Sequence, residues 1–215
     1  MSLDVVGVCN LALSRAGHVE TITSLDESST AAEKCSLVYE HVRDNLLRDF
    51  VWGFAKRNVA LALVSGGEFV GWDYVYRYPS DCLSARQVCD AAGCRMRWYD
   101  YNPSNDDSLL TWMPPKVPYQ VSGDDDGKTI LTDMEEAYLV YTKRMTDTNL
   151  MDDSFLDLWA WSIAMEIAPS LRAKSAVISF VANGYQSSRI QAETLNMNEM
   201  QKDADPESPA IQARY

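Results

Sequence analysis

The hydrophobic pattern of this chain changes its period twice, and this double change limits the folds that the chain can adopt. Apolar residues recur at helical spacing as far as Arg57, and short runs rich in Val, Tyr, Trp, Leu and Thr follow between Gly and Pro. Helical spacing returns after Asn149 and lasts to Lys202. The order predicts an α+β fold whose terminal helices pack as a helical bundle, with an antiparallel β region inserted between them.

The same changes divide the chain into regions. Residues 1–57 and 150–202 are predicted to form one helical domain, and residues 58–149 the inserted β-rich region. The last part of the chain contains two prolines and has no periodic pattern, so residues 203–215 are expected to form an extended C-terminal arm.

Local signals indicate where the helices begin and end. Thr30 suits an N-cap, and Glu33 would complete a capping box before the longest apolar stripe of the N-terminal part. Ser2 is the expected cap of the first helix and Gly17 its end. Gly184 is expected to weaken the last helix by about 1 kcal/mol relative to Ala and to mark a kink. The four predicted helices are Leu3–Ala16, Thr30–Phe50, a third that starts at Asp152 or Asp153 and ends near Ala168, and Ser175–Lys202.

Turn residues delimit the predicted strands, which should pair as one antiparallel, partly irregular sheet. These strands are Val59–Val64, Asp73–Tyr78, Ala85–Val88, Arg95–Tyr101, Leu109–Trp112, Val117–Ser122, Lys128–Thr132 and Ala137–Met145.

The net charge of −12 is the strongest compositional feature. An acidic surface releases no counterions from DNA, which argues against a broad nucleic-acid footprint and against adsorption to anionic membranes. Acidic composition also keeps a protein soluble, and the sequence alone does not place the charge on any one surface.

The five cysteines do not form a metal-binding pattern. Cys9 and Cys35 lie on apolar helical faces and are predicted to be small core residues. Cys89 and Cys94 lack a second pair or a nearby His, so zinc has little support, and reduced thiols are expected. The N-terminus lacks a basic region of the secretory type, and the apolar segment Phe155–Ala168 is too short to span a bilayer.

The acidic loop Asp124–Asp126 is the best chemical candidate in the sequence. One interpretation is a degraded calcium loop, with Ser122, Asp124 and Asp126 as ligands. The favoured interpretation is a hairpin turn, because Asp126 and Gly127 stand together between two strand-like runs.

Other catalytic patterns receive less support. Asp106 and Asp107 could join this loop in a two-metal site, but a solvated run of charge is the favoured interpretation. His18 and His41 have no evident Ser or Cys partner, and no phosphate-binding glycine loop occurs. We therefore expect no enzymatic activity and no cofactor.

Five blocks of residues, in the same order, resemble the tail tubular protein A family of short-tailed bacteriophages. The blocks are LALSRAG from Leu11; ITSLDESS from Ile22 with AAEKC from Ala31; Tyr39, Arg43-Asp44, Leu47-Arg48 and Trp52–Ala55; YRYPSDCL from Tyr76; and ILTDMEEAYLVYTKRMTD from Ile130. The resemblance covers about Leu11 to Ala168 and thins beyond it.

The resemblance implies a virion structural protein, a head-to-tail adaptor that forms a ring of about twelve copies between the portal protein and the tail nozzle protein. DNA would pass through the ring without specific binding, and no membrane would be involved. The protein would assemble in the bacterial host cytoplasm and reside in the neck of the virion. Ile211, Arg214 and Tyr215 would then dock the arm on the portal, and Asp124, Asp125 and Asp126 would face the channel or solvent.

Two other functions stay open. One is a metal-dependent hydrolase that uses the Asp-rich loops. The other is a small acidic protein that binds a basic host partner, which predicts a stable monomer and strongly salt-sensitive binding.

Overall fold

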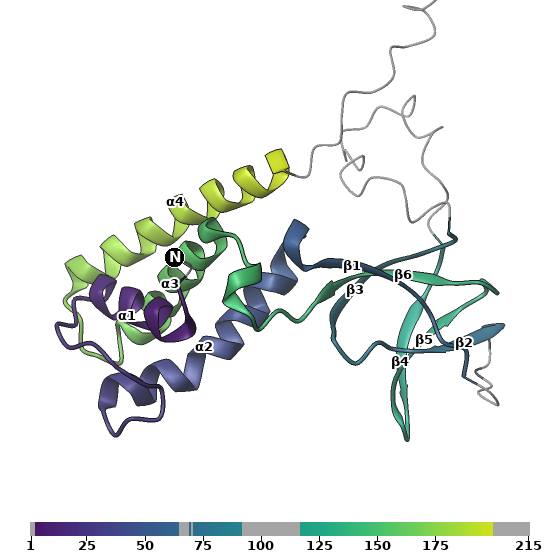
Figure 1. Cartoon of the computed structure of the whole chain (residues 1–215), viewed down its shortest axis with the longest axis horizontal. Coiled ribbons are helices and arrows are strands. Elements are labelled where there is room, and N and C mark those ends of the chain that lie inside the picture. The colour runs from purple at the N-terminus through teal and green to yellow at the C-terminus, as the bar shows by residue number, and fades with distance from the viewer. Residues whose placement is uncertain (1–2, 65–68, 70, 92–116, 200–215) are drawn as a thin grey trace, which may run out of the picture. The chain divides into compact units, whose positions relative to one another are not determined.

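The computed structural model describes residues 3–64, 69, 71–91 and 117–199 (Figure 1). Within these residues it has four α-helices and two small antiparallel sheets, so the predicted α+β class is confirmed. The chain separates into two compact units, called here the helical unit (Met1–Val42 and Thr148–Tyr215) and the β-rich unit (Arg43–Asp147). The division falls inside helix α2 (Thr30–Asp49), whereas the sequence-based boundaries lie after Arg57 and Asn149.

In the helical unit, helix α1 spans Val5–Arg15 and begins at a side-chain cap. Asp4 is this cap, because its Oδ1 accepts a hydrogen bond from the Gly7 amide at 2.7 Å. The predicted cap at Ser2 is therefore wrong, and Ser2 itself lies outside the described residues. Gly17, with φ of +78°, follows the end of the helix as predicted.

In helix α2 the cap is Ser29, one residue before the cap that the sequence analysis expected. The Ser29 hydroxyl accepts from the Ala32 amide at 3.1 Å and its carbonyl from the Glu33 amide at 3.0 Å. Thr30, the predicted cap, is instead the first helical residue.

A single carboxylate, Glu27, orders the loop that leads into α2. It accepts hydrogen bonds from the Thr23 amide and the Ser29 hydroxyl, both at 2.8 Å, and from the Thr23 hydroxyl at 3.0 Å. The Thr23 amide bond, followed by the hydroxyl bonds of Ser29 and Thr23, lowers the pKa of Glu27 to about 2.

Helix α3 spans Asp153–Ile167 and is buried over most of its surface, as its apolar sequence predicts. The Trp159 indole N–H donates to the Tyr39 carbonyl of α2 at 3.0 Å, which satisfies the polar edge of a buried ring. Nine of its residues are buried: Phe155, Leu156, Leu158, Trp159, Ala160, Ser162, Ile163, Ala164 and Ile167.

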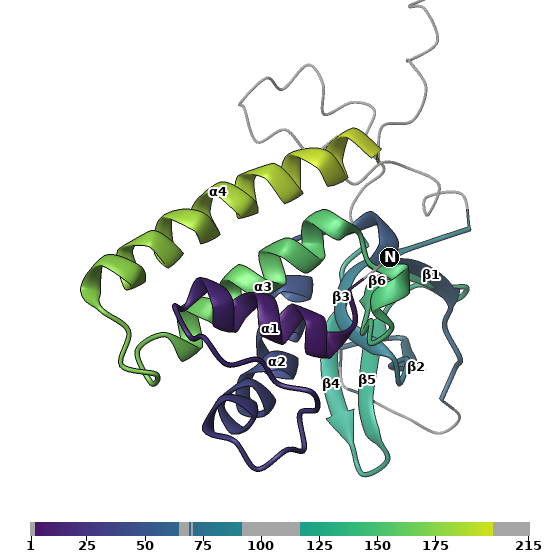
Figure 2. The ribbon, with the colours of Figure 1, turned by 60° about the vertical axis from the view of Figure 1, so that its left-hand side comes forward.

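Helix α4 spans Ser175–Glu199, and α3 lies between it and α1 (Figure 2). Gly184 does not interrupt α4. It admits the Trp161 ring of α3, because a Cβ built at this position would lie 2.4 Å from ring carbons. The sequence analysis missed this close packing of α3 and α4, which explains why glycine occupies position 184.

One carboxylate joins three helices of this unit. Asp157 of α3 forms an ion pair with Arg15 of α1 and accepts a hydrogen bond from the Ser188 hydroxyl of α4 at 2.8 Å. The Arg15 guanidinium also lies 4.1 Å from the ring centre of Trp161.

The cysteines match the predictions in part. Cys9 and Cys35 are fully buried free thiols of α1 and α2, as expected, and their mutual hydrogen bond, together with burial, raises the pKa of Cys9. Cys89 is disulfide-bonded, and its partner lies outside the described residues. The expectation that all five thiols are reduced is therefore wrong for Cys89.

In the described residues of the β-rich unit the strands form two three-stranded sheets instead of the predicted single sheet. In the first sheet, β6 (Tyr138–Lys143) lies between β1 (Lys56–Ala60) and β3 (Cys82–Cys89). In the second sheet, β5 (Gly127–Thr132) lies between β2 (Tyr74–Arg77) and β4 (Gln120–Asp124). Both sheets contribute to one apolar cluster, formed by Tyr76, Val88, Ile130, Ala137, Leu139 and Tyr141.

Strand β1 lies earlier than predicted. It pairs antiparallel with β6, from Lys56 opposite Thr142 to Ala60 opposite Tyr138, although the sequence analysis placed a strand at Val59–Val64. The polar sequence KRNVA gives no alternation, and only pairing with the distant strand β6 defines its register. The predicted strands Arg95–Tyr101 and Leu109–Trp112 lie outside the described residues.

Arg86 of β3 closes the C-terminal end of α2. Its Nη2 donates to the carbonyls of Leu47, Arg48 and Phe50 at 2.7 to 3.2 Å, and its Nε donates to the Thr142 hydroxyl at 3.0 Å. The last carbonyls of a helix lack intrahelical partners, so this guanidinium caps the helix from a distant strand.

Candidate functional site

The acidic loop is the tip of a hairpin, as the sequence analysis favoured. Strands β4 and β5 pair up to Asp124 opposite Gly127, which leaves Asp125 and Asp126 as the two turn residues (Figure 1). Gly127 has φ of +130°, a conformation that its missing side chain permits. The run from Ser122 to Thr132 therefore forms two strands and a turn, which leaves no continuous ligand loop of the calcium type.

The turn carboxylates are exposed, and one of them has a basic neighbour. Asp126 lies 3.7 Å from the guanidinium of Arg77, which belongs to β2. At this exposure such a pair contributes little to stability. The turn therefore presents negative charge to solvent. The side chain of Asp124 is outside the described part of the structure.

A pocket of about 690 Å³ lies beside this hairpin in the β-rich unit. Its wall combines apolar groups of β1 and the following residues with five charged side chains. The charged lining residues are Arg77, Asp81, Asp126, Lys128 and Arg144. The pocket wall therefore presents charges of both signs.

The carboxylate of Asp81, which lines the pocket, has two side-chain partners. It accepts from the Tyr141 hydroxyl at 3.0 Å and pairs with the Lys143 ammonium at 3.2 Å. Burial, followed by the bond to Asp81 and its negative charge, raises the pKa of Tyr141 to about 12. Tyr141 is therefore a protonated donor at neutral pH. Asp81 holds the side chains of Tyr141 and Lys143, both on β6, through one carboxylate.

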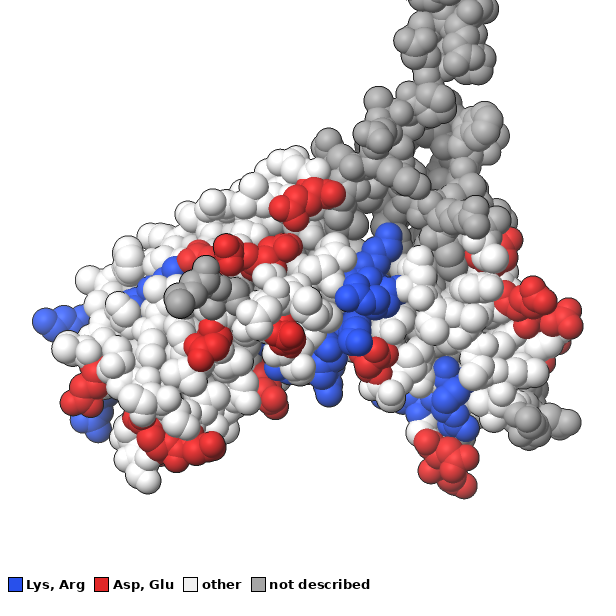
Figure 3. All heavy atoms as spheres, in the orientation of Figure 1, with Lys and Arg blue, Asp and Glu red and all other residues white. Residues whose placement is uncertain are grey.

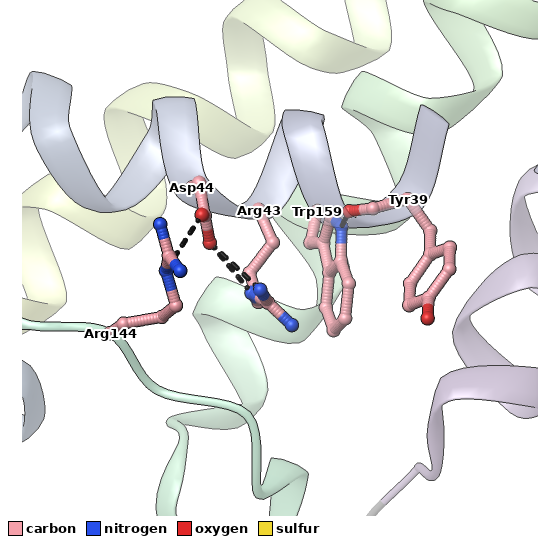
Figure 4. Close-up of polar contacts among 5 residues, drawn as sticks. All are labelled: Tyr39, Arg43, Asp44, Arg144 and Trp159. Carbon is pink, nitrogen blue, oxygen red and sulfur yellow. Dashed lines mark hydrogen bonds and ion pairs between the residues drawn. The ribbon is translucent and has the colours of Figure 1, made fainter. Parts of the chain in front are cut away.

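A second carboxylate, Asp44, lies between two arginines (Figure 4). Arg43 donates to Asp44 Oδ1 through Nε at 3.0 Å and Nη2 at 2.8 Å, and Arg144 approaches Oδ2 at 3.0 Å. Arg43 is only 4% exposed, so its charge needs this partner. Arg144 is about half exposed and also lines the pocket. The sequence analysis assigned no role to this trio.

Several predicted site residues cannot be placed. Ile211, Arg214 and Tyr215 of the predicted docking arm lie outside the described residues, and so do Asp106 and Asp107. Across residues 3–64, 69, 71–91 and 117–199, no three His, Cys, Asp or Glu side chains are grouped in a way that could hold a metal ion. Nor does any helix in these ranges have the length and apolarity needed to cross a membrane.

No protein-family model matches the chain, and a comparison with curated proteins gives no match either. The resemblance to the tail tubular protein A family therefore stays a prediction.

Proposed function

We propose that this chain is a head-to-tail adaptor of a short-tailed bacteriophage or prophage, a structural protein that forms a ring of about twelve copies between portal and tail nozzle. In this proposal the helices of the helical unit form a bundle, and residues 203–215 form an arm that docks on the portal through Ile211, Arg214 and Tyr215. The hairpin carboxylates face the DNA channel or solvent. The protein is not an enzyme in this proposal, and it acts in the neck of the virion after assembly in the host cytoplasm.

The observation that supports the proposal best is where the resembling blocks lie in the fold. Trp52, from the third block, is buried and donates to the Leu46 carbonyl at 2.8 Å. Asp44, from the same block, forms an ion pair with the buried guanidinium of Arg43. Asp81, from the fourth block, accepts a hydrogen bond from the hydroxyl of Tyr141 in the fifth block. The resemblance thus includes residues that define packing, which supports a shared fold, and the adaptor function follows from that fold by analogy.

Native mass spectrometry of the full-length protein, alone and mixed with the portal protein from the same genome, tests the proposal. We expect a portal complex that carries about twelve copies of the 24.1 kDa protein. A protein that stays monomeric and ignores the portal at every mixing ratio contradicts the adaptor function.

A shortened variant that ends at Lys202 tests the arm separately. It should fold as the full-length protein does, with the same thermal unfolding, yet bind the portal more weakly, because Tyr and Arg are favoured interface anchors. The matched full-length variant, Arg214→Ala with Tyr215→Ala, should reproduce most of that loss. Undiminished portal binding by both variants would contradict the docking role while leaving the ring itself open to the first test.

A further inference from the structure

Two free thiols meet inside the helical unit. Cys9 of α1 and Cys35 of α2 are both 0% exposed, and their side chains form a hydrogen bond with each other. The two helices are joined by the loop of residues 16–29, and both thiols belong to the same compact unit. The thiol–thiol contact therefore connects two separate helices through their sulfur atoms.

The surroundings of the two thiols are small and apolar. Ala12, one turn after Cys9, and Ala32, one turn before Cys35, are both 0% exposed. Disulfide formation shortens the sulfur–sulfur distance from hydrogen-bond contact to about 2.0 Å, which is a movement of the two side chains. Alanine has no atoms beyond Cβ, so these two neighbours leave the sulfur atoms room to move.

Helix α3 connects α1 and α2 without covalent bonds. Helix α1 packs along α3, and the Trp159 indole of α3 donates to the Tyr39 carbonyl of α2. A bond between the two sulfur atoms would join α1 and α2 directly, in addition to the packing that each makes with α3.

We propose that Cys9 and Cys35 form a reversible redox crosslink, in which a small-molecule disulfide oxidises the pair to an internal disulfide. One cysteine thiolate attacks the small disulfide, forms a mixed disulfide and releases one small thiolate. The other cysteine attacks the mixed disulfide, closes the Cys9–Cys35 bond and releases the second small thiolate. The released thiolates take up the two cysteine protons, so the protein pair is oxidised and the small disulfide is reduced to two thiols. This site does not depend on the adaptor function.

Burial should make this reaction slow. The hydrogen bond to Cys35, followed by burial, raises the pKa of Cys9, and the thiolate is the reactive form. A dissolved oxidant therefore reaches the pair only when the helical unit opens transiently. Cys82, a half-buried free thiol of the β-rich unit, should react first. Reducing compartments keep thiols free, so the crosslink should form after the protein leaves such a compartment.

The test uses the full-length protein and an uncharged oxidant, 2-hydroxyethyl disulfide. Figure 3 shows acidic groups spread over the surface of the helical unit, and these would repel an anionic oxidant. After alkylation of the remaining thiols, trypsin digestion without reduction separates the cysteines, because trypsin cuts after Arg15, Lys34 and Arg43. Mass spectrometry should find the peptides of residues 1–15 and 35–43 joined, with the loss of two hydrogen atoms.

We expect the Cys9–Cys35 crosslink in the native protein to exceed the crosslinks of either cysteine to Cys82 about tenfold or more, because packing raises the effective concentration of one thiol at the other. The preference should fall when the same reaction is run in urea. The crosslinked protein should unfold at a temperature about 5–10 °C higher, since the bond constrains the unfolded chain.

Two variants separate this bond from other oxidation. Cys35→Ala should abolish the rise in unfolding temperature, whereas the matched control Cys82→Ala should keep it. Thermal unfolding in reducing buffer establishes that both variants fold. The peptide map uses the unmodified protein, so it tests the proposal even if a variant folds poorly.

Three results would overturn the proposal. One is an equal crosslink preference in native and urea-unfolded protein, because the pairing would then be random. Another is a pair that stays reduced after incubation just below the unfolding temperature, where the unit opens often, although Cys82 is modified. The third is a rise in unfolding temperature that persists in Cys35→Ala. None of these results bears on portal binding, which the earlier experiments test separately.

Discussion

At the scale of single residues, position 184 of α4 must be glycine because the side chain of Trp161, from α3, packs directly against it. The Trp161 ring occupies the space that a Cβ at position 184 would need. Gly184 does not have a positive φ, so this position needs glycine for space and not for an unusual backbone conformation.

Gly184→Ala should lower the free energy of unfolding by about 1–2 kcal/mol, because the steric cost exceeds the better helix propensity of Ala. Urea unfolding measures the change, and Ser187→Ala on the exposed side of α4 is the control that should cost nothing. In a Trp161→Leu background the same Gly184→Ala change should become neutral or stabilising. Equal losses in both backgrounds would show that Trp161 is not the cause.

Asp44 is the second residue that its neighbours require, because the buried guanidinium of Arg43 needs a carboxylate beside it. Asp44→Ala should destabilise the protein by about 3 kcal/mol, because Arg43 would remain buried without its carboxylate. Chemical denaturation measures the loss, and the exposed neighbour Asp49 provides Asp49→Ala as the control. Replacing both members of the pair, Arg43→Met with Asp44→Leu, should restore most of the stability. If Asp44→Ala and Asp49→Ala unfold alike, the pair contributes nothing measurable.

At the scale of elements, the loop before α2 depends on an ionised Glu27. The hydrogen bonds to Glu27 lower its pKa from 4.5 to about 2, so they stabilise the folded state fully above pH 4.5, and this stabilisation is lost as the pH falls through 2. Glu27→Gln should therefore be less stable than the unmodified protein near pH 7, with a difference that shrinks between pH 4.5 and pH 2.

Thermal unfolding as a function of pH measures this difference, and the exposed residue Glu20 supplies the control variant Glu20→Gln. A gap between Glu27→Gln and the unmodified protein that stays constant down to pH 2 would contradict the assignment.

Most elements were predictable from local patterns, and the differences have physical causes. The hairpin at Asp126-Gly127 and the helices α1, α3 and α4 follow from turn chemistry and periodicity, which are local signals. The cap at Ser29 lay one residue from the predicted one because Ser and Thr are both good caps.

Contacts between distant residues were not predictable. Arg86 caps α2 from a strand that follows it by more than thirty residues. The Arg43–Asp44–Arg144 trio likewise joins a helix to the end of β6. Sequence periodicity identifies faces and boundaries, but it contains no information on which side group of a later element reaches a given carbonyl or carboxylate.

At the scale of the whole molecule, the net charge of −12 sets the expected response to salt. Copies that assemble into a ring although their acidic surfaces repel should associate more strongly as salt screens the repulsion. An acidic protein that binds a basic partner should bind more weakly under the same change. Sedimentation equilibrium across a salt series, with a neutral osmolyte series as the control, distinguishes these functions. Association that weakens steadily with salt would favour the host-interaction alternative.

The ion pair between Asp44 and Arg144 also has an evolutionary consequence. Asp44 stands where the polypeptide enters the β-rich unit and Arg144 where it leaves, and their charged groups lie 3.0 Å apart. A module whose two ends adjoin can be gained, lost or exchanged by recombination without rerouting the rest of the protein. The two chain ends of the β-rich unit are therefore held together, which is the arrangement that tolerates insertion or exchange of the segment between them.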